Sequence, residues 1–339
     1  MICSGPRNLI TDVAGISVGQ AEDATVCTGV TVVMADQPIL AAVDVRGGAP
    51  GSRELDVLDP SNLVGGMDAV VLSGGSVFGL EAASGVVAHL SDASRGFCIA
   101  PGAPPAPIVP SAILFDLANG GDKNWQTPPY ADLGRKAAAA AGRNFALGNA
   151  GAGFGAIAGA YKGGTGSASV VLEDGCTLGA LAAVNALGSP VMSGCDAFWA
   201  WPFERENEFG GRRPPATWTP MAHELPADMK SVARAEANTT IAVIATDADL
   251  NRGELKRLAI MASDGFARAL YPAHTPFDGD IVFALATAKR TIDGDRAVEL
   301  IRLGACAADC MARAIARGVY AAESLNGVAS YRDKFKAAD

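Results

Sequence analysis

The fold of this chain can be worked out from one stretch, Asn238-Thr239-Thr240-Ile241-Ala242-Val243-Ile244-Ala245-Thr246. It is rich in β-branched residues, a composition typical of a buried strand. Residues 202–237, just before it, are rich in Pro, Glu, Arg, Asn and Gly and have the composition of a loose loop or linker. Because a long loop inside a compact protein is usually functional, we expect the strand to hold Thr239 rigidly at the end of that loop.

Thr239 has a chemical use there if the chain is cut between Asn238 and Thr239. The new chain would begin with threonine, whose α-amine has an ordinary pKa of about 7.7–8.0 and lies within reach of its own hydroxyl. That amine can accept the hydroxyl proton as the oxygen attacks a carbonyl group. The sequence therefore suggests a self-processing amide hydrolase. The alternative is that Asn-Thr-Thr is the ordinary start of a strand, where threonine is common.

The composition indicates association between subunits. The chain has 339 residues, enough for one large domain or two. Hydrophobic residues make up 49% and charged residues 19%, against a usual charged share of about 25%, so we expect surface to be buried between subunits. The net charge of −9 argues against nonspecific binding to nucleic acid or an anionic membrane.

Neither a membrane span nor a secretion signal is predicted. No apolar run reaches the length of a transmembrane helix, and the first residues lack the apolar segment of a signal peptide, so we expect a cytoplasmic protein. The seven cysteines suggest reduced thiols. Cys306 and Cys310 are four apart on a predicted helix, but the three histidines are distant in sequence, so we expect small buried residues, no metal site and no cofactor.

A glycine turn follows the predicted strand Ala69-Val70-Val71-Leu72. Ser73-Gly74-Gly75-Ser76 leads into a helical pattern, and such a turn can point N–H groups at an anion or oxyanion. It could also be a nucleophile elbow, but Gly74-Gly75-Ser76-Val77-Phe78 lacks the last glycine of G-x-S-x-G, and no histidine has a convincing triad context. Tight packing of the turn is the favoured interpretation.

A second glycine-rich segment supports a different hypothesis, a dinucleotide-binding module. Residues 148–158 contain a G-x-G-x-x-A spelling, with Glu173 downstream. The preceding Phe145-Ala146-Leu147 is a poor strand, and a chain with 40 glycines produces such a pattern by chance. Retention of nicotinamide nucleotide on purification would favour this alternative.

Polar residues interrupt the remaining predicted elements at a few places. Asn185 is one polar residue in the otherwise apolar run 178–186, where its amide must find partners or face a site. Asp278 and Asp280 precede the predicted strand 281–286, and their spacing can aim both carboxylates to the same side. We also expect neighbouring strands at 29–33 and 41–45. Helices are expected at 133–141 and 295–322, and a further helix should begin at a capping pair formed by Asn251 and Glu254.

Four of these motifs, in order over nearly the whole chain, resemble the DmpA/NylC family: the turn Leu72–Ser76, the segment Gly148–Gly155, Asn238-Thr239-Thr240 before a strand, and the loop Phe277–Asp280. That family contains aminopeptidases, β-aminopeptidases and nylon-oligomer hydrolases that cleave themselves into two subunits. The resemblance implies an α/β (α+β) fold, a four-layer αββα sandwich of the DmpA/ArgJ-like type. It further implies one structural domain cut into subunits 1–238 and 239–339, assembled as homo-oligomers that are tetramers of αβ units or larger assemblies.

The resemblance also implies the site residues. Thr239 would be the nucleophile and Asn185 the oxyanion donor, with Lys162, Asp278 and Asp280 in support. Family members often have Tyr where this chain has Phe115, and losing one oxyanion donor can cost about 2.7–4 kcal/mol. The substrate would be a small peptide, amide or oligomer, with its class left open between α-peptides, β-peptides, D-amino-acid amides and 6-aminohexanoate oligomers.

A Thr-dependent N-acyltransferase of related fold is the closest alternative enzyme. It would pass the acyl group to an amine, so competition between water and amine acceptors would separate the two activities.

Overall fold

The strand that begins at Thr239 lies at the centre of the molecule. A computed structural model of the protein describes residues 2–98, 100–219, 225–230 and 238–336. Strand β11 (Thr239–Ala248) is buried along its whole length. Its side chains alternate, with Ile241 and Val243 facing the space between two sheets and Ala242 and Ile244 facing a layer of helices. This two-residue period is that of a strand buried on both faces.

The first sheet contains β11 and the strands on either side of it. Its order is β1 (Cys3–Ser4), β9 (Gly164–Val171), β10 (Thr177–Asn185), β11 and β12 (Ile281–Arg290). β10 runs antiparallel to β11, whereas β12 runs parallel to it. The beginnings of β11 and β12 therefore meet at one edge of the sheet, together with the end of β10.

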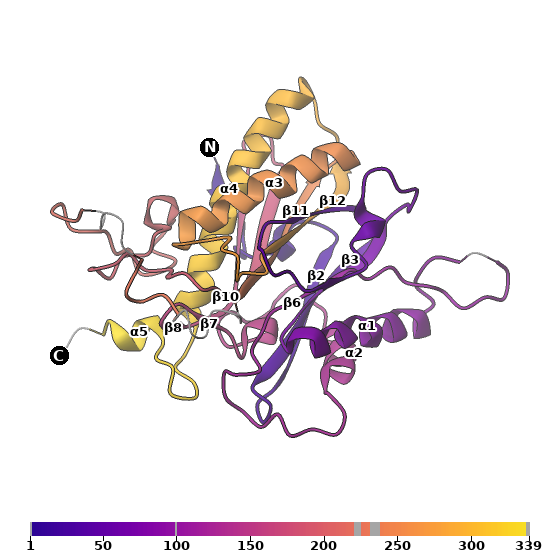
Figure 1. Cartoon of the computed structure of the whole chain (residues 1–339). Helices are drawn as coiled ribbons and strands as arrows, with labels where there is room; N and C mark the ends of the chain where they lie inside the picture. The colour runs from indigo at the N-terminus through magenta and orange to yellow at the C-terminus, as the bar shows by residue number, and fades with distance from the viewer. Residues whose placement is uncertain (1, 99, 220–224, 231–237, 337–339) are drawn as a thin grey trace.

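Two helices, α3 (Arg252–Ala269) and α4 (Arg296–Ala321), cover the outer face of this sheet (Figure 1). The predicted capping pair is confirmed, since the Asn251 side chain accepts from the Glu254 N–H and the Glu254 side chain accepts from the Asn251 N–H. The Asp295 side chain caps α4 by accepting from the N–H groups of Ala297 and Val298. No helix in the described ranges combines the length and apolar character needed to cross a bilayer.

One long strand, β3 (Thr28–Val45), belongs to both sheets. The prediction of two separate strands at 29–33 and 41–45 is wrong. Residues 40–45 pair with β12 and residues 30–34 pair with the second sheet, with a register shift between Met34 and Ile39. The exposed polar residues between these halves resemble a turn in sequence, although the strand continues through them.

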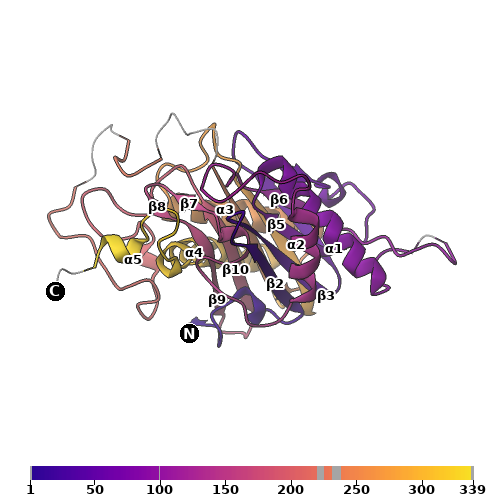
Figure 2. The same ribbon diagram turned by 90° about the horizontal axis from the view of Figure 1, so that it is seen from below.

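The second sheet packs against the first. It contains β2 (Ile16–Asp23), β3, β5 (Met67–Ser73), β6 (Ser111–Ile113) and β4 (Ser52–Arg53). Helices α1 (Glu81–Asp92) and α2 (Tyr130–Ala139) cover its outer face, on the opposite side of the molecule from α4 (Figure 2). Buried apolar residues form three layers: under α3 and α4, between the sheets, and under α1 and α2. The predicted four-layer αββα sandwich is thus confirmed.

Short elements connect these layers. They are η1 (Ile10–Asp12), η2 (Asp56–Leu58), η3 (Ser76–Leu80), η4 (Gly151–Gly153), the hairpin β7 (Ile157–Ala158) and β8 (Tyr161–Lys162), η5 (Trp201–Phe203) and α5 (Tyr331–Lys334).

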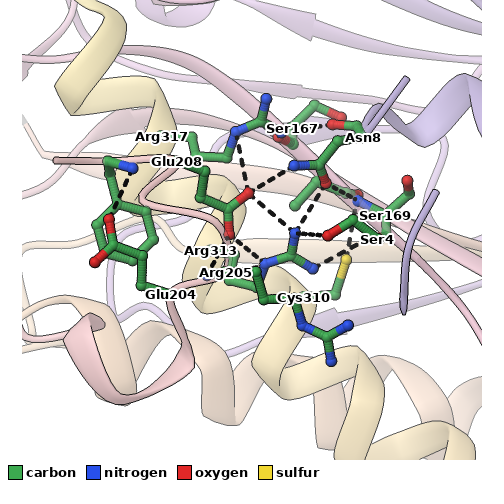
Figure 3. Close-up of polar contacts among 12 residues, drawn as sticks. Ser4, Asn8, Ser167, Ser169, Glu204, Arg205, Glu208, Cys310, Arg313 and Arg317 are labelled. Atoms are coloured by element: carbon green, nitrogen blue, oxygen red, sulfur yellow. Dashed lines mark hydrogen bonds and ion pairs between the residues drawn. The ribbon is translucent and has the colours of Figure 1, made fainter. Parts of the chain in front are cut away.

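The segment predicted as a loose loop, residues 202–237, is ordered in part. Phe209 is buried, and the Glu208 carboxylate pairs with the guanidinium of Arg313, whose Nε lies 2.5 Å from Glu208 Oε1 (Figure 3). Arg313 also donates to Asn8 Oδ1 at 2.9 Å and to the Ser169 carbonyl at 3.1 Å. Helix α4 is therefore held to residues far apart in the sequence by one buried cation. Residues 220–224 and 231–237 of the predicted loop lie outside the described residues.

Candidate active site

Thr239 is the first residue of β11 and lies where three chain segments meet. Its direct neighbour across the antiparallel pair is Asn185, the last residue of β10. On the other side, Asn238 forms a parallel bridge with Asp278. Both Asn238 and Thr239 are at least 95% buried. The β-branched run that predicted this strand thus places Thr239 between Asn185 and the Asp278–Asp280 loop.

The carbonyl group between Asn238 and Thr239 receives two hydrogen bonds. The Thr239 hydroxyl donates to the Asn238 oxygen, and the Gly279 N–H donates to the same oxygen at 3.0 Å. A Cβ at position 279 would lie 2.7 Å from Thr239 Oγ, so only glycine brings its backbone this close. The hydroxyl and a backbone donor therefore converge on one peptide bond, an arrangement suited to acyl transfer.

The two predicted carboxylates lie on either side of this donor. Asp280 Oδ1 accepts from the Thr240 N–H at 2.8 Å. Asp278 Oδ2 accepts from the N–H and the hydroxyl of Thr275, at 2.8 and 2.7 Å, and its Oδ1 accepts from the Leu187 N–H at 3.3 Å. Burial, followed by the nearby charge of Asp280, raises the pKa of Asp278. A carboxylate with a raised pKa is a better proton acceptor than an ordinary aspartate.

Asn185 is fully buried and its side-chain amide is oriented by several donors. Its Oδ1 accepts from the Ile157 N–H at 2.9 Å and from Lys230 Nζ at 3.2 Å, and its Nδ2 donates to the Phe115 carbonyl at 3.0 Å. The Phe115 backbone therefore contacts this amide even though its side chain carries no hydroxyl.

Lys230 is a site residue that the sequence did not indicate. Its Nζ also donates to the Asn185 carbonyl at 3.0 Å, and its N–H donates to the Leu187 carbonyl at 2.9 Å. Burial lowers the pKa of Lys230 to about 7, against the opposing charge of Asp278 and with a smaller lowering from Lys162. It lies in the compositionally polar segment before the strand, where nothing in the sequence sets it apart from other lysines.

Lys162 lies on the hairpin strand β8, close enough to Lys230 for its charge to lower the pKa of that residue. It is 2% exposed, and its Nζ donates to the carbonyls of Gly163 at 2.8 Å and Gly153 at 3.1 Å. Burial lowers the pKa of Lys162 to about 7, although the neighbouring Cys27 and Asp116 oppose the shift. A lysine with such a pKa can take up and release a proton near neutral pH.

The glycine-rich segment 148–158 supports these side chains and does not have the geometry of a dinucleotide fingerprint. Gly151–Gly153 is a single 3₁₀ turn followed by the β7–β8 hairpin, whereas the fingerprint requires a strand before the glycines and a helix after them. Its Gly153 carbonyl accepts from Lys162 and its Ile157 N–H donates to Asn185. The dinucleotide hypothesis is therefore wrong for this segment.

The turn Ser73–Ser76 is packed tightly, as the favoured interpretation expects. The Gly74 N–H donates to the Gly29 carbonyl, and the Ser76 N–H donates to the Leu114 carbonyl, both at 2.9 Å. The Gly75 N–H donates to Asp116 Oδ1 at 2.8 Å. These three donors are engaged within the fold. Asp116 is a buried carboxylate that the sequence did not indicate, and burial raises its pKa.

A cavity of about 380 Å³ opens beside Thr239. Val77, Leu80, Ile113, Phe115 and Phe277 supply apolar lining, and Ser52, Ser76, Asn238 and Thr239 supply polar lining. Val77 and Phe277 are 62% and 40% exposed, so a ligand can reach them from solvent. The cavity can hold an aliphatic group next to the hydroxyl.

The chain is similar to known proteins over most of its length. The profile of peptidase family S58 matches residues 8–332. A Mycobacterium tuberculosis protein named as an uncharacterized aminopeptidase is 44% identical, and the alignment covers 98% of this chain and 99% of that protein. A 6-aminohexanoate-oligomer endohydrolase of Kocuria sp. is 31% identical, with 91% of this chain and 85% of that protein covered.

Solved structures share the fold. A β-aminopeptidase of Burkholderia sp. superposes with a TM-score of 0.71 at 24% identity, covering 97% of this chain and 91% of that one. The L-aminopeptidase D-Ala-esterase/amidase of Ochrobactrum anthropi, described as a variant of the Ntn hydrolase fold, gives a TM-score of 0.69 at 24% identity, with coverages of 96% and 89%. By its family profile and its relatives, the chain belongs to peptidase family S58, the DmpA/NylC family, and is an amide hydrolase.

Proposed function

We propose that this protein is a self-cleaving amide hydrolase whose nucleophile is Thr239. The observation that carries the proposal is the pair of hydrogen bonds on the Asn238 carbonyl, one from the Thr239 hydroxyl and one from the Gly279 N–H. The hydroxyl touches the very peptide group that it would attack. Cleavage there divides the chain into subunits 1–238 and 239–339.

In self-cleavage, the Thr239 hydroxyl oxygen attacks a peptide bond of its own chain. Thr239 Oγ forms a bond to the Asn238 carbonyl carbon, and the negative charge that develops on the carbonyl oxygen is stabilised by the Gly279 N–H. A carboxylate of the Asp278–Asp280 pair takes the hydroxyl proton and returns it to the Thr239 nitrogen as the C–N bond breaks. Water then hydrolyses the resulting ester, releasing the Asn238 carboxylate and restoring the hydroxyl.

The mature enzyme uses the same oxygen on a substrate. The free α-amine of Thr239 accepts the hydroxyl proton, and the oxygen attacks a substrate amide to give an acyl-enzyme that water hydrolyses. Asn185 donates to the oxyanion, with its amide oriented by Ile157 and Lys230. Lys162 stabilises negative charge at the site. Because Phe115 supplies no hydroxyl, more of this stabilisation falls on Asn185 than in relatives that have tyrosine there.

The shape and lining of the cavity favour substrates with an uncharged aliphatic acyl part. Among the described residues that line it, none has an ionisable side chain, and Val77, Leu80 and Phe277 contribute apolar surface. An ammonium group placed there would find oxygen acceptors on Ser52, Ser76 and Asn238 but no side-chain carboxylate to replace its hydration. Amides whose acyl chain carries no nearby charge, such as internal units of an aliphatic oligoamide, fit this lining better than substrates with a free amine beside the scissile bond.

We also propose that the cleaved units associate into a homo-oligomer. Leu63 is fully exposed and Phe97 is 61% exposed beside a mainly apolar cavity of about 680 Å³, and the low charged share of the sequence is consistent with an additional buried surface. Light scattering at micromolar concentration should give four αβ units.

Trapping of the acyl-enzyme tests the hydrolase mechanism. A p-nitrophenyl ester of hexanoic acid should acylate the purified protein in a burst, and peptide mapping should place the hexanoyl group on Thr239. Labelling at another residue, with Thr239 unmodified, would refute the proposal. Added amines test the acyltransferase alternative, because an acyltransferase would pass the hexanoyl group to the amine faster than water hydrolyses the acyl-enzyme.

A further inference from the structure

His274 is connected to the candidate site, although sequence reasoning assigned it no role. It lies in the left-handed backbone region, with φ 54°, in the loop before the two carboxylates. Its ring packs against Phe266 of α3 with a centroid distance of 5.2 Å. Nδ1 lies 2.8 Å from Asp280 Oδ2, and the His274 N–H donates to the same oxygen at 3.2 Å.

The partners of the imidazole restrict its protonation. Nε2 lies 3.3 Å from the Ser263 carbonyl, which can only accept, so Nε2 must carry a proton to bond there. Nδ1 faces a carboxylate oxygen that already accepts the His274 N–H. Every arrangement that satisfies these hydrogen bonds therefore places one proton between His274 Nδ1 and Asp280 Oδ2. It is either an imidazolium beside a carboxylate or a neutral imidazole beside a carboxylic acid.

The surroundings favour the imidazolium. Burial lowers the pKa of His274, but the hydrogen bond and charge of Asp280, together with the Ser263 carbonyl, outweigh it and raise the pKa above its ordinary value of 6.5. Arg46 acts in the opposite direction. Its guanidinium is engaged by Asp44 at 2.6 Å, and Asp44 also lies 3.2 Å from Lys256 Nζ. The charge of Asp44 is thus balanced without His274.

We propose that His274 is a positioning residue that acts as a fixed cation behind the nucleophile. Protonated on both ring nitrogens, it holds Asp280 ionised against the Thr240 N–H and so fixes the backbone that carries Thr239. By neutralising one of two buried carboxylates, it allows Asp278 to ionise as well and to take the hydroxyl proton. This inference rests on the proposed function of Thr239.

The protonation state can be measured without any catalysis. The Thr239→Ala variant keeps the chain uncut, and ¹⁵N-labelled histidine reports each ring nitrogen by NMR. His274 should show two protonated nitrogens at pH 7, and the additional Asp280→Asn change should convert it to a neutral ring. A neutral His274 ring at pH 7 in Thr239→Ala would overturn the proposal.

Removing the charge of His274 should change the pH dependence of the self-cleavage rate. His274→Asn keeps a side chain that tolerates a positive φ and can donate a neutral hydrogen bond, but removes the charge. Losing a cation beside a carboxylate pair should raise the pKa of the remaining proton acceptor, so the acid limb of the self-cleavage rate should move up by about one pH unit. The rate would be followed by mass spectrometry after cell-free synthesis and transfer to buffers of different pH.

His89→Asn, on helix α1, is the matched control and should leave the profile unchanged. In the mature His274→Asn enzyme, the acid limb of the profile of kcat against pH should also move to higher pH, with little change in KM. If the wild-type chain cuts before Thr239 and His274→Asn has the same pH profile, the inference is wrong and the proposed function stands. If the wild-type chain is never cut, the proposed function itself fails.

Discussion

The backbone N–H of Gly279 lies 3.0 Å from the carbonyl oxygen of Asn238, in the peptide group that Thr239 would attack. This relationship gives the glycine between Asp278 and Asp280 a purpose beyond chain flexibility. The loop presents a donor between two carboxylates, and the parallel bridge between Asn238 and Asp278 sets its register. Self-cleavage then needs no rearrangement to find its oxyanion donor.

Gly279→Ala should slow self-cleavage by at least about tenfold. The added Cβ would lie 2.7 Å from Thr239 Oγ and 2.8 Å from the Ala49 carbonyl, so the hydroxyl or the loop must move, and small misplacements of reacting groups can cost about 100-fold. Gly253→Ala, where the new Cβ would lie 3.4 Å from Asn251 Oδ1, is the control. Equal cleavage rates for the two variants, measured by mass spectrometry, would remove Gly279 from the mechanism.

Asp278→Ala and Asp280→Ala should each slow self-cleavage. Before cleavage the Thr239 nitrogen is an amide and cannot act as a base, so a carboxylate must take or orient the hydroxyl proton. Whatever fraction matures should show a lowered kcat more than a raised KM, as expected when transition-state interactions are lost. Normal maturation and normal hydrolysis in both variants would mean that these carboxylates only stabilise the loop.

The stability of the uncut chain should depend on Lys162 between pH 7 and 10.5. The pKa of Lys162 is about 7 in the folded protein and about 10.5 when unfolded, so the unfolded state binds more protons within this window. The free energy of unfolding should therefore rise with pH there, by up to about 1.4 kcal/mol per pH unit from this one group.

Denaturant titrations of Thr239→Ala with and without Lys162→Met measure that contribution. Lys162→Met should flatten the rise of the free energy of unfolding between pH 7 and 10.5. Lys289→Met, at an exposed position, should leave that rise unchanged. An unchanged slope in the Lys162→Met protein would show that this lysine stays charged when buried.

Glu208→Gln should weaken the association of the two cleaved subunits. Glu208 belongs to residues 1–238 and Arg313 to residues 239–339, and Arg313 is 1% exposed (Figure 3). Breaking a buried ion pair by removing one partner costs about 3–5 kcal/mol because the other charge stays buried. Glu323→Gln, which removes an 80% exposed carboxylate 3.9 Å from Arg332, should leave thermal unfolding unchanged. Equal melting temperatures for the two variants would contradict this role.

Sequence reasoning identified the parts of the site that lie at the ends of regular elements. The β-branched run predicted β11, Asn185 stood out as a polar residue in the apolar run that forms β10, and the paired aspartates marked the start of β12. Such residues interrupt an apolar pattern, and the interruption is visible in the sequence.

The residues that were missed have no such local signal. Lys230 and His274 lie in irregular segments and reach the site through long-range or loop contacts, such as those with Asn185 and Asp280. Asp116 lies just beyond β6, which ends at Ile113, and its role in holding the Gly75 turn depends on a contact between residues 41 positions apart. The continuity of β3 was hidden by its exposed polar middle.

The intact mass of freshly purified protein tests the central claim most directly. The account predicts two tightly associated polypeptides, the smaller beginning at Thr239, and a single full-length chain of 34.4 kDa for Thr239→Ala. Thr239→Ser should retain partial cleavage, since only the methyl group is lost. A wild-type protein that hydrolyses amides as one uncut chain of 34.4 kDa would contradict the account.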